Sequence, residues 1–240
     1  FLGDWLNTAT SPLRTKDYRA LQTLPVRTPR EHIERLPFIL RDGAKEFRLT
    51  TEQFRWEYTP GKTALVWGFN GQVPGPEIRV TEGEKVRIIV TNNISEPATV
   101  HWHGAEVSFP NDGVVDLSQK AIQPGATYVY EFAATPAGTR FYHTHFHRHG
   151  SGEVIRGGSG AFIIEPKNYQ KPDREYTLIL NEWKNAPILT AEGKQQIEAS
   201  IYTINGRWFP FLPPLYVKTG ERMLIRIINA SFTSASFPMH

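Results

Sequence analysis

The chain has 240 residues, of which 40% are hydrophobic and 12% aromatic, which suits one large domain or two ordinary ones with packed cores. The formal net charge is only +3 and basic residues alternate with acidic ones, so the composition argues against a nucleic-acid-binding protein. The sequence contains no run of about 18 apolar residues, so it predicts no membrane-spanning helix. The absence of cysteine excludes disulfides and thiolate metal ligands.

The first part of the chain, residues 1–45, lacks an alternating pattern and is rich in Arg, Pro and Thr. We predict that it is an extended arm that wraps the surface, with one short helix near residues 29–36.

Short alternating segments fill residues 46–166 and are separated by turns that contain glycine or proline. Apolar residues at every second position are typical of half-buried strands. The pattern places Ile78, Val80, Val86, Ile88 and Val90 on one face. The segments that show it are FRLTTEQFRWEY, EIRV, KVRIIV and TYVYEF, and GAFIIEP closes the series. Short strands at this spacing predict an all-β fold, either a sandwich or a barrel.

A polar segment with prolines, residues 167–175, predicts a linker, and a new strand series begins at residue 176 with YTLILNEW. An internal repeat follows, because residues 69–92 resemble residues 204–229: both contain an Asn-Gly pair, a Gly-Glu pair and an alternating apolar run. Residues 176–240 therefore begin a second domain that stops some strands short of a full sandwich. We expect either that the natural chain continues past this point or that another chain completes the domain.

Two His-x-His pairs stand out among the eight histidines: His101 with His103, and His143 with His145. Residues i and i+2 of a strand project from the same face, so each pair can point one way. Four imidazoles that converge without a thiolate suit copper or zinc better than iron or nickel. The alternative is that each pair is a surface imidazole couple.

The histidine run continues with His147 and His149, but glycines follow and the sequence there is typical of a loop. We expect both of these side chains to be solvent-exposed or to support the site rather than to bind a metal.

The motifs FNGQVPGPEIRV, HWHG, GTRFYHTH and GGSGAFIIEP together resemble the first cupredoxin domain of the multicopper oxidases, the family of laccases and metallo-oxidases. The resemblance covers residues 46–166, and the repeat extends it to residue 240. It implies a Greek-key cupredoxin-like β-sandwich, with one complete domain and part of a second.

By this resemblance His101 would bind a type 2 copper, and His103, His143 and His145 would bind a type 3 copper pair. These residues would be half of a trinuclear cluster, held between two cupredoxin domains, that reduces dioxygen to water. The type 1 copper needs a cysteine and is expected outside this chain.

Two further residues have roles that the resemblance suggests. Asp112 matches an acid near the type 2 copper that helps deliver protons; the alternative is a plain Asp-Gly turn. His240 lies as far beyond Asn229 as His103 lies beyond Asn92, so it is either a copper ligand or a structural residue.

The resemblance implies the N-terminal part of a copper-dependent oxidoreductase, periplasmic or secreted. The whole protein would couple one-electron oxidation of a small reducing substrate, such as a phenol or a metal ion, to four-electron reduction of dioxygen. The fragment alone would be inactive and would need the missing cupredoxin domain. The alternatives are a module that stores or delivers copper without oxidase activity, and a structural subunit that has lost its metals.

Overall fold

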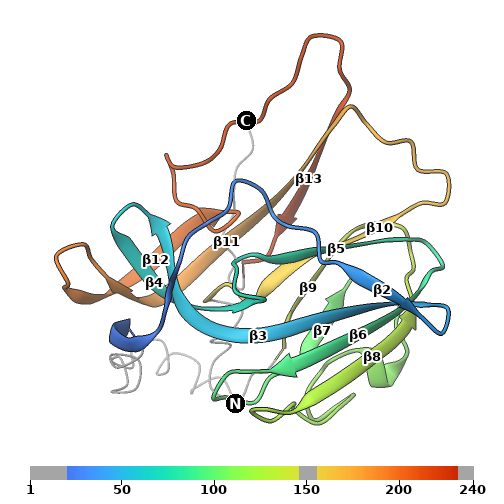
Figure 1. The fold of residues 1–240 in the computed structure, drawn as a ribbon, viewed down its shortest axis with the longest axis horizontal. Helices are drawn as coiled ribbons and strands as arrows, with labels where there is room; N and C mark the ends of the chain where they lie inside the picture. Colours follow the sequence, from blue (N-terminus) through green and yellow to red (C-terminus); the bar gives the residue numbers. More distant parts are fainter. Residues whose placement is uncertain (1–20, 146–155, 232–240) are drawn as a thin grey trace, which may run out of the picture.

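The computed structural model describes residues 21–145 and 156–231, and these residues form an all-β structure (Figure 1). One 3-10 turn, η1 (Phe109–Asn111), lies between β7 and β8. None of the helical segments in the described ranges has the length and hydrophobicity to cross a lipid bilayer. The strands are β1 Val26–Arg27, β2 Phe38–Arg41, β3 Ala44–Thr59, β4 Lys62–Phe69, β5 Gly75–Thr81, β6 Lys85–Asn92, β7 Val100–His103, β8 Thr127–Ala133, β9 Gly138–Thr144, β10 Ser159–Glu165, β11 Arg174–Leu189, β12 Gln195–Ile204 and β13 Met223–Asn229.

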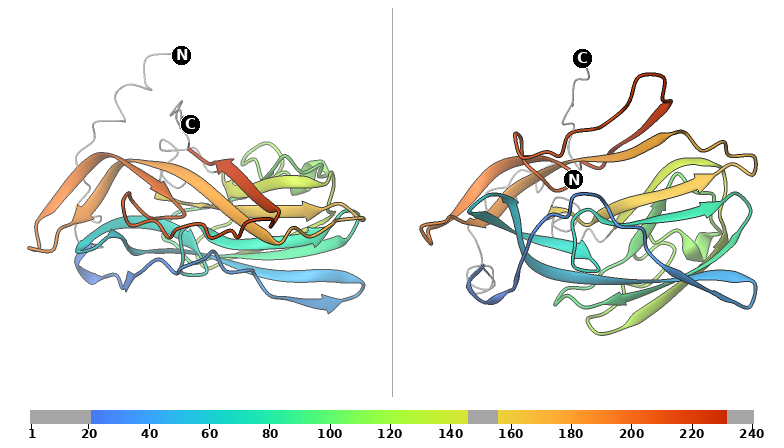
Figure 2. Two further views of the ribbon diagram at one scale, coloured as in Figure 1. Left: turned by 90° about the horizontal axis from the view of Figure 1, so that it is seen from above. Right: turned by 45° about the horizontal axis from the view of Figure 1, so that its top comes forward.

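The strands form two sheets. The larger sheet has the order β12-β11-β4-β3-β6-β8, with β1 and β2 also paired to β3 and with β13 paired to β11. The smaller sheet has the order β5-β10-β9-β7. In the right-hand view of Figure 2 the strands of the second half, orange to red, lie along the upper side of the molecule, and part of the blue arm rises from the lower side toward them. The prediction of a cupredoxin-like all-β sandwich is confirmed.

The first core lies between the small sheet and strands β3, β6 and β8 of the large one. Its largest fully buried side chains include Phe47, Trp102 and Tyr130. The face predicted from the alternating pattern is buried here, with exposed fractions of at most 2%, at Ile78, Val80, Val86, Ile88 and Val90. The alternation of apolar residues therefore predicted correctly which face of β5 and of β6 is buried.

Strand β3 is long enough to serve two cores. Its first half packs in the first core, and its second half carries Phe54 and Trp56 into a second core with Trp183 and Ile188 of β11. Strand β4 pairs with β3 along its length and with β11 at Ile188. The two halves of the chain thus share one continuous hydrogen-bonded sheet.

Strand β10 forms a wall common to both halves. Phe162 on one of its faces packs in the first core, while Ile163 on the other packs against Ile179 of β11 and Ile228 of β13. Burial on both faces explains why GAFII is an unbroken apolar run rather than an alternating one.

The internal repeat has the same local structure in both copies. Asn70 and Asn205 adopt positive φ angles of 50° and 51°, a conformation that asparagine tolerates. The Asn70 Oδ1 accepts a hydrogen bond from the Thr50 N–H (2.7 Å), and the Asn205 Oδ1 accepts one from the Ile179 N–H (2.8 Å). Strands β3 and β6 pair in parallel, as do β11 and β13.

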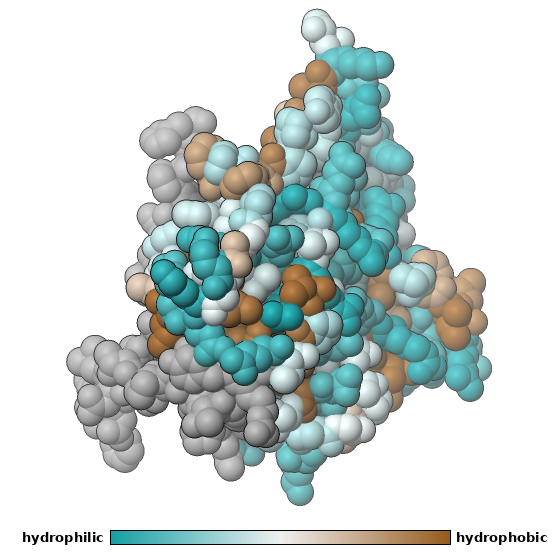
Figure 3. Space-filling view, turned by 60° about the vertical axis from the view of Figure 1, so that its left-hand side comes forward, coloured by the Kyte–Doolittle hydropathy of each residue, from teal (hydrophilic) through white to brown (hydrophobic). Residues whose placement is uncertain are grey.

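The two copies differ in how their apolar faces are covered. The face of β6 that belongs to the first core is buried, whereas the equivalent face of β13 is open in the described part of the chain. Figure 3 shows hydrophobic residues, brown, among hydrophilic ones, teal, in the projecting upper part of the molecule. The exposed fractions are 41%, 37% and 38% for Met223, Ile225 and Ile227.

Residues 21–23 of the arm are helical and the rest lies on the sandwich as extended chain, so the helix predicted near residues 29–36 is wrong. Strands β1 and β2 pair with β3. Between them, the Leu36 N–H donates to the Glu77 carbonyl and the Glu77 N–H donates to the Glu34 carbonyl, both at 2.8 Å. The backbone partners offered by the open edge of β5 outweigh the local helix propensity of this segment.

A buried ionic network joins the small sheet to the second half. Arg79 of β5, 9% exposed, donates to Glu77 (2.7 Å), Glu165 (2.8 Å) and Glu175 of β11 (2.9 Å). Arg226 of β13 donates to the same Glu175 at 2.6 Å. Each charge is therefore paired, as buried charges must be.

This network predicts an acid-sensitive contribution to stability. Burial raises the pKa of Glu175, but hydrogen bonds from Arg226 and Arg79 outweigh it and hold the pKa below the ordinary 4.5. A carboxyl with a depressed pKa stabilises the fold above its unfolded-state value, and this stabilisation is lost as the pH falls through the folded-state pKa. We expect the free energy of unfolding, measured by urea titration, to fall as the pH drops below 4.5.

Glu175→Gln should flatten that part of the pH profile, while Glu31→Gln, at a side chain that is 75% exposed, should leave it unchanged. An unaltered profile in Glu175→Gln would contradict this account.

Candidate metal centre

The register of β7 and β9 brings the two histidine pairs together. His101 lies directly opposite His143 in this antiparallel pair, so their side chains project from the same face of the small sheet. His103, two residues along β7, shares that face. Trp102 lies between them in sequence, faces the other way and is fully buried in the first core. Because side chains alternate between the two faces of β7, burial of the tryptophan on one face places the imidazoles together on the other face.

Three of these imidazoles meet at metal-binding distance. Among the described residues, His101, His103 and His143 each offer a ligand atom, and these atoms all lie within 4.8 Å of one another. The Nδ1 of His103 and the Nε2 of His143 are 3.4 Å apart. Two imidazole nitrogens bound tetrahedrally to one ion at about 2.0–2.1 Å would lie about 3.3–3.4 Å apart. The spacing fits two ligands of one ion.

His145 completes the group just after the end of β9. Its ring centroid is 5.4 Å from that of His101 and 5.7 Å from that of His143. The structure thus brings together all four histidines of the two pairs. His147, His149 and His240 lie outside the described residues.

Backbone carbonyls orient two of the rings. The Nδ1 of His101 is 2.7 Å from the Asp112 carbonyl, and the Nδ1 of His143 is 2.9 Å from the Thr144 carbonyl. A carbonyl can only accept, so each Nδ1 must carry the proton. The Nε2 lone pair of each ring is then free for a metal, the arrangement usual for histidine ligands.

The site also favours uncharged imidazoles. Burial lowers the pKa of His143 to about 3 despite its hydrogen bond to the Thr144 carbonyl, and the three neighbouring histidines add to the effect. Burial, and then the proximity of His101, lowers the pKa of His103. At neutral pH both rings are neutral, which is the form that binds a metal.

Asp112 lies beside this group, in the loop that follows η1. Its carboxylate Oδ1 is 3.3 Å from the His101 Nδ1, and its side chain is 36% exposed. An acid in this place touches both solvent and a ring of the cluster, so it can move protons between them.

The face that carries the histidines is also the face that the second half covers. Ser159 of β10 lies opposite His143, and its hydroxyl is 3.4 Å from the amide nitrogen of Asn181 in β11. The same amide donates to the Ala230 carbonyl at 3.2 Å. Sequence reasoning missed this polar link, because the register of β10 against β9 and β11 cannot be read from residue types.

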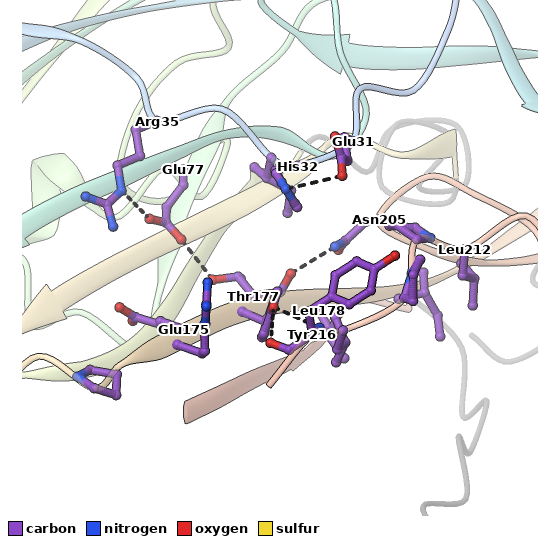
Figure 4. Close-up of a pocket in the computed structure, with 18 of the residues that line it drawn as sticks. Glu31, His32, Arg35, Glu77, Glu175, Thr177, Leu178, Asn205, Leu212 and Tyr216 are labelled. Atoms are coloured by element: carbon purple, nitrogen blue, oxygen red, sulfur yellow. Dashed lines mark hydrogen bonds and ion pairs between the residues drawn. The ribbon is translucent and has the colours of Figure 1, made fainter. Parts of the chain in front are cut away.

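A separate cavity of about 630 Å³ lies between the arm and β11 (Figure 4). Its charged groups are largely paired with one another: Arg35 lies 3.4 Å from Glu77, and the Thr177 hydroxyl donates to Glu77 at 2.9 Å. None of the four clustered histidines lines this cavity. The metal-binding chemistry of the described residues therefore belongs to the histidine face.

The sequence comparisons with known proteins agree with one another. The sequence model of the family described as multicopper oxidase matches residues 50–169. "Laccase-7" of Arabidopsis thaliana is 33% identical over 73% of this chain and 34% of its own length. "L-ascorbate oxidase" of Nicotiana tabacum is 37% identical over 60% of this chain and 25% of its own length.

A solved structure, the blue copper oxidase from Nitrosomonas europaea, superposes with a TM-score of 0.66 at 37% identity. That match covers 78% of this chain and 61% of the other. The chain spans 34% and 25% of the length of these two curated relatives.

Proposed function

Because the chain belongs to the multicopper oxidase family, we propose that its four clustered histidines are half of a trinuclear copper site at which dioxygen is reduced to water. The observation that carries the proposal is the convergence of His101, His103 and His143 within 4.8 Å on one face of the small sheet. If the two pairs were independent surface histidines, nothing would require them to converge on one face of two neighbouring strands.

The donor set fits copper. It consists of neutral imidazoles without a thiolate, and imidazole is a ligand that suits copper. The 3.4 Å separation supports assigning His103, through Nδ1, and His143, through Nε2, to one ion of the type 3 pair. His145 would bind the other ion of the pair, and His101 would bind the type 2 copper through its free Nε2. For His240 we keep both roles, copper ligand and structural residue.

Bound copper would supply one-electron steps, and the residues of this chain would control ligand orientation and protons. The carbonyls of Asp112 and Thr144 hold two rings in the tautomer that binds metal. Reduction of one dioxygen to two waters consumes four electrons and four protons, so a proton source is needed beside the site. The Asp112 carboxylate, next to His101 and open to solvent, is our candidate for that source.

The remaining parts of the oxidase would come from polypeptide other than these 240 residues. A type 1 copper needs a cysteine, and this sequence has none. We propose that a further cupredoxin domain, in the same or another chain, supplies that copper, the other histidines and the site for a small reducing substrate such as a phenol or a metal ion. These 240 residues alone would be inactive, and the protein would work in the periplasm or outside the cell.

Copper analysis of the complete gene product, with its measured mass, tests the proposal. We expect a blue type 1 absorption band, a type 2 EPR signal and an EPR-silent copper pair, together with oxygen consumption. Bound copper without the blue band and without oxygen consumption would instead favour a copper-storage module. A metal-free product that stays metal-free in excess copper would overturn both.

Asp112→Asn in the complete protein should slow the oxygen step by about 100-fold or more, the scale of a lost general acid. Copper content should stay the same, because the amide keeps the shape of the side chain and the main-chain carbonyl that faces His101. Stopped-flow reoxidation of the reduced protein measures the step. Glu106→Gln, which removes another acid from the loop after β7, is the matched control. Equal reoxidation rates in the wild type and Asp112→Asn would make Asp112 a turn residue only.

A further inference from the structure

Gly113 lies against the backbone of β7 more closely than any other residue type could. Its φ of +79° is in the left-handed region. A Cβ at this position would lie 1.9 Å from the Val100 carbonyl oxygen and 3.0 Å from the His101 Cα. Both are main-chain atoms of the strand that carries the first histidine pair, so neither can rotate away. A side chain at residue 113 must therefore push the loop and the strand apart.

The loop is anchored on its other side as well. The Tyr128 hydroxyl donates to the Pro110 carbonyl at 2.9 Å, and the Glu131 N–H donates to the Asn111 side-chain oxygen at 2.8 Å. Strand β8 therefore holds η1 in place. Between this anchor and β7, the close approach at Gly113 sets the spacing between loop and strand, and the Asp112 carbonyl lies 2.7 Å from the His101 Nδ1.

We propose that Gly113 is a positioning residue for His101: its missing side chain lets the Asp112 carbonyl hold the Nδ1 proton of the ring, so that Nε2 faces the metal site. The carbonyl is the closer partner, because the Asp112 carboxylate oxygen is 3.3 Å from the same nitrogen. The orientation of His101 is thus set by main-chain geometry, and the Asp112 side chain is left to act on protons. The link to copper rests on the proposed function, but the tautomer does not.

The ring nitrogens of His101 can be read directly in the metal-free chain by long-range ¹H–¹⁵N NMR, with the signals assigned by their loss in His101→Gln. We expect the proton on Nδ1 in the wild type and in Asp112→Ala, which keeps the main-chain carbonyl. Gly113→Ala should shift the population toward the Nε2–H tautomer. Gly125→Ala is the matched control, because Gly125 has a φ of +78° and a Cβ added there would have no heavy atom within 4 Å.

Three results would overturn the proposal. One is a wild-type proton on Nε2. Another is a change of tautomer in Asp112→Ala, which would give the orienting role to the carboxylate. The third is a wild-type tautomer in a folded Gly113→Ala. If Gly113→Ala does not fold while Gly125→Ala does, the wild type and Asp112→Ala still decide the tautomer.

Copper affinity gives a second readout. Loss of a group that orients a histidine ligand typically costs 10–100-fold in metal affinity. We expect Gly113→Ala to weaken Cu(II) binding to the complete gene product by this factor and Gly125→Ala to leave it unchanged. If neither the wild type nor any variant binds Cu(II), the proposed function fails. The tautomer measurement still tests the role of Gly113 in that case.

Discussion

Replacing His143 by alanine in the complete copper protein is expected to empty one position of the type 3 pair and to abolish oxygen consumption. His143 lies at the centre of the site, opposite His101 and 3.4 Å from the nearest nitrogen of His103. Its Nδ1–H donates a hydrogen bond to the Thr144 carbonyl, so the lone pair of its Nε2 is free to face the cluster. Under the proposed assignment, removing it takes away a direct ligand, and we expect copper affinity at that position to fall by more than the roughly 100-fold that loss of a supporting group costs.

Copper content per protein and the EPR-silent fraction measure this effect. His103→Ala should have the same effect, because both rings, 3.4 Å apart, are proposed to bind one ion. The blue type 1 band should remain in both variants. His32→Ala, in the arm and 68% exposed, is the control and should retain all copper. Oxygen consumption at the wild-type rate in either cluster variant would remove the assignment.

Arg79→Ala is expected to destabilise the fold by about 3–5 kcal/mol, the cost of breaking a buried ion pair. The guanidinium is 9% exposed and contacts Glu77, Glu165 and Glu175. Without it, Glu77 and Glu175 remain buried with fewer counter-charges. Arg226 can still neutralise Glu175, but among the described residues the one cation left beside Glu77 is the exposed Arg35.

The midpoint of urea denaturation measures this loss. Arg174→Ala is the matched control: this arginine of β11 is 41% exposed and paired with Glu221. An exposed pair of this kind is worth about 0–1 kcal/mol. Equal losses in the two variants would show that the network around Arg79 adds nothing beyond a surface ion pair.

The sequence predicted the alternating strands β5, β6 and β8 and the unbroken apolar run of β10, but it missed β1, β2 and β4. Strands β5, β6 and β8 have one face in the core, and this shows as a period of two. Strand β4 is buried along most of its length, so its apolar run has no alternation to read. Strands β1 and β2 are too short for a pattern and depend on the edges of other strands.

The part of the candidate site that depends on residue types, the two histidine pairs, was predictable from the sequence. His-x-His on a strand indicates two imidazoles on one face, and the structure places the two pairs opposite each other. The groups that orient the rings were not predictable, because the carbonyls of Asp112 and Thr144 are main-chain atoms present at every position. Gly113 carries a weak signal, since Asp-Gly is also an ordinary turn sequence.

Strand β10, enclosed by a core on each face, has a consequence for the order in which the chain gains protection from solvent. It pairs in parallel with β5, which is distant in sequence, and its outer face is covered only once β11 and β13 exist. Contacts between distant segments form late, because the loop between them must close first. The amide hydrogens of β10 should therefore exchange with deuterium only through global opening, and during synthesis this strand should be among the last to become protected.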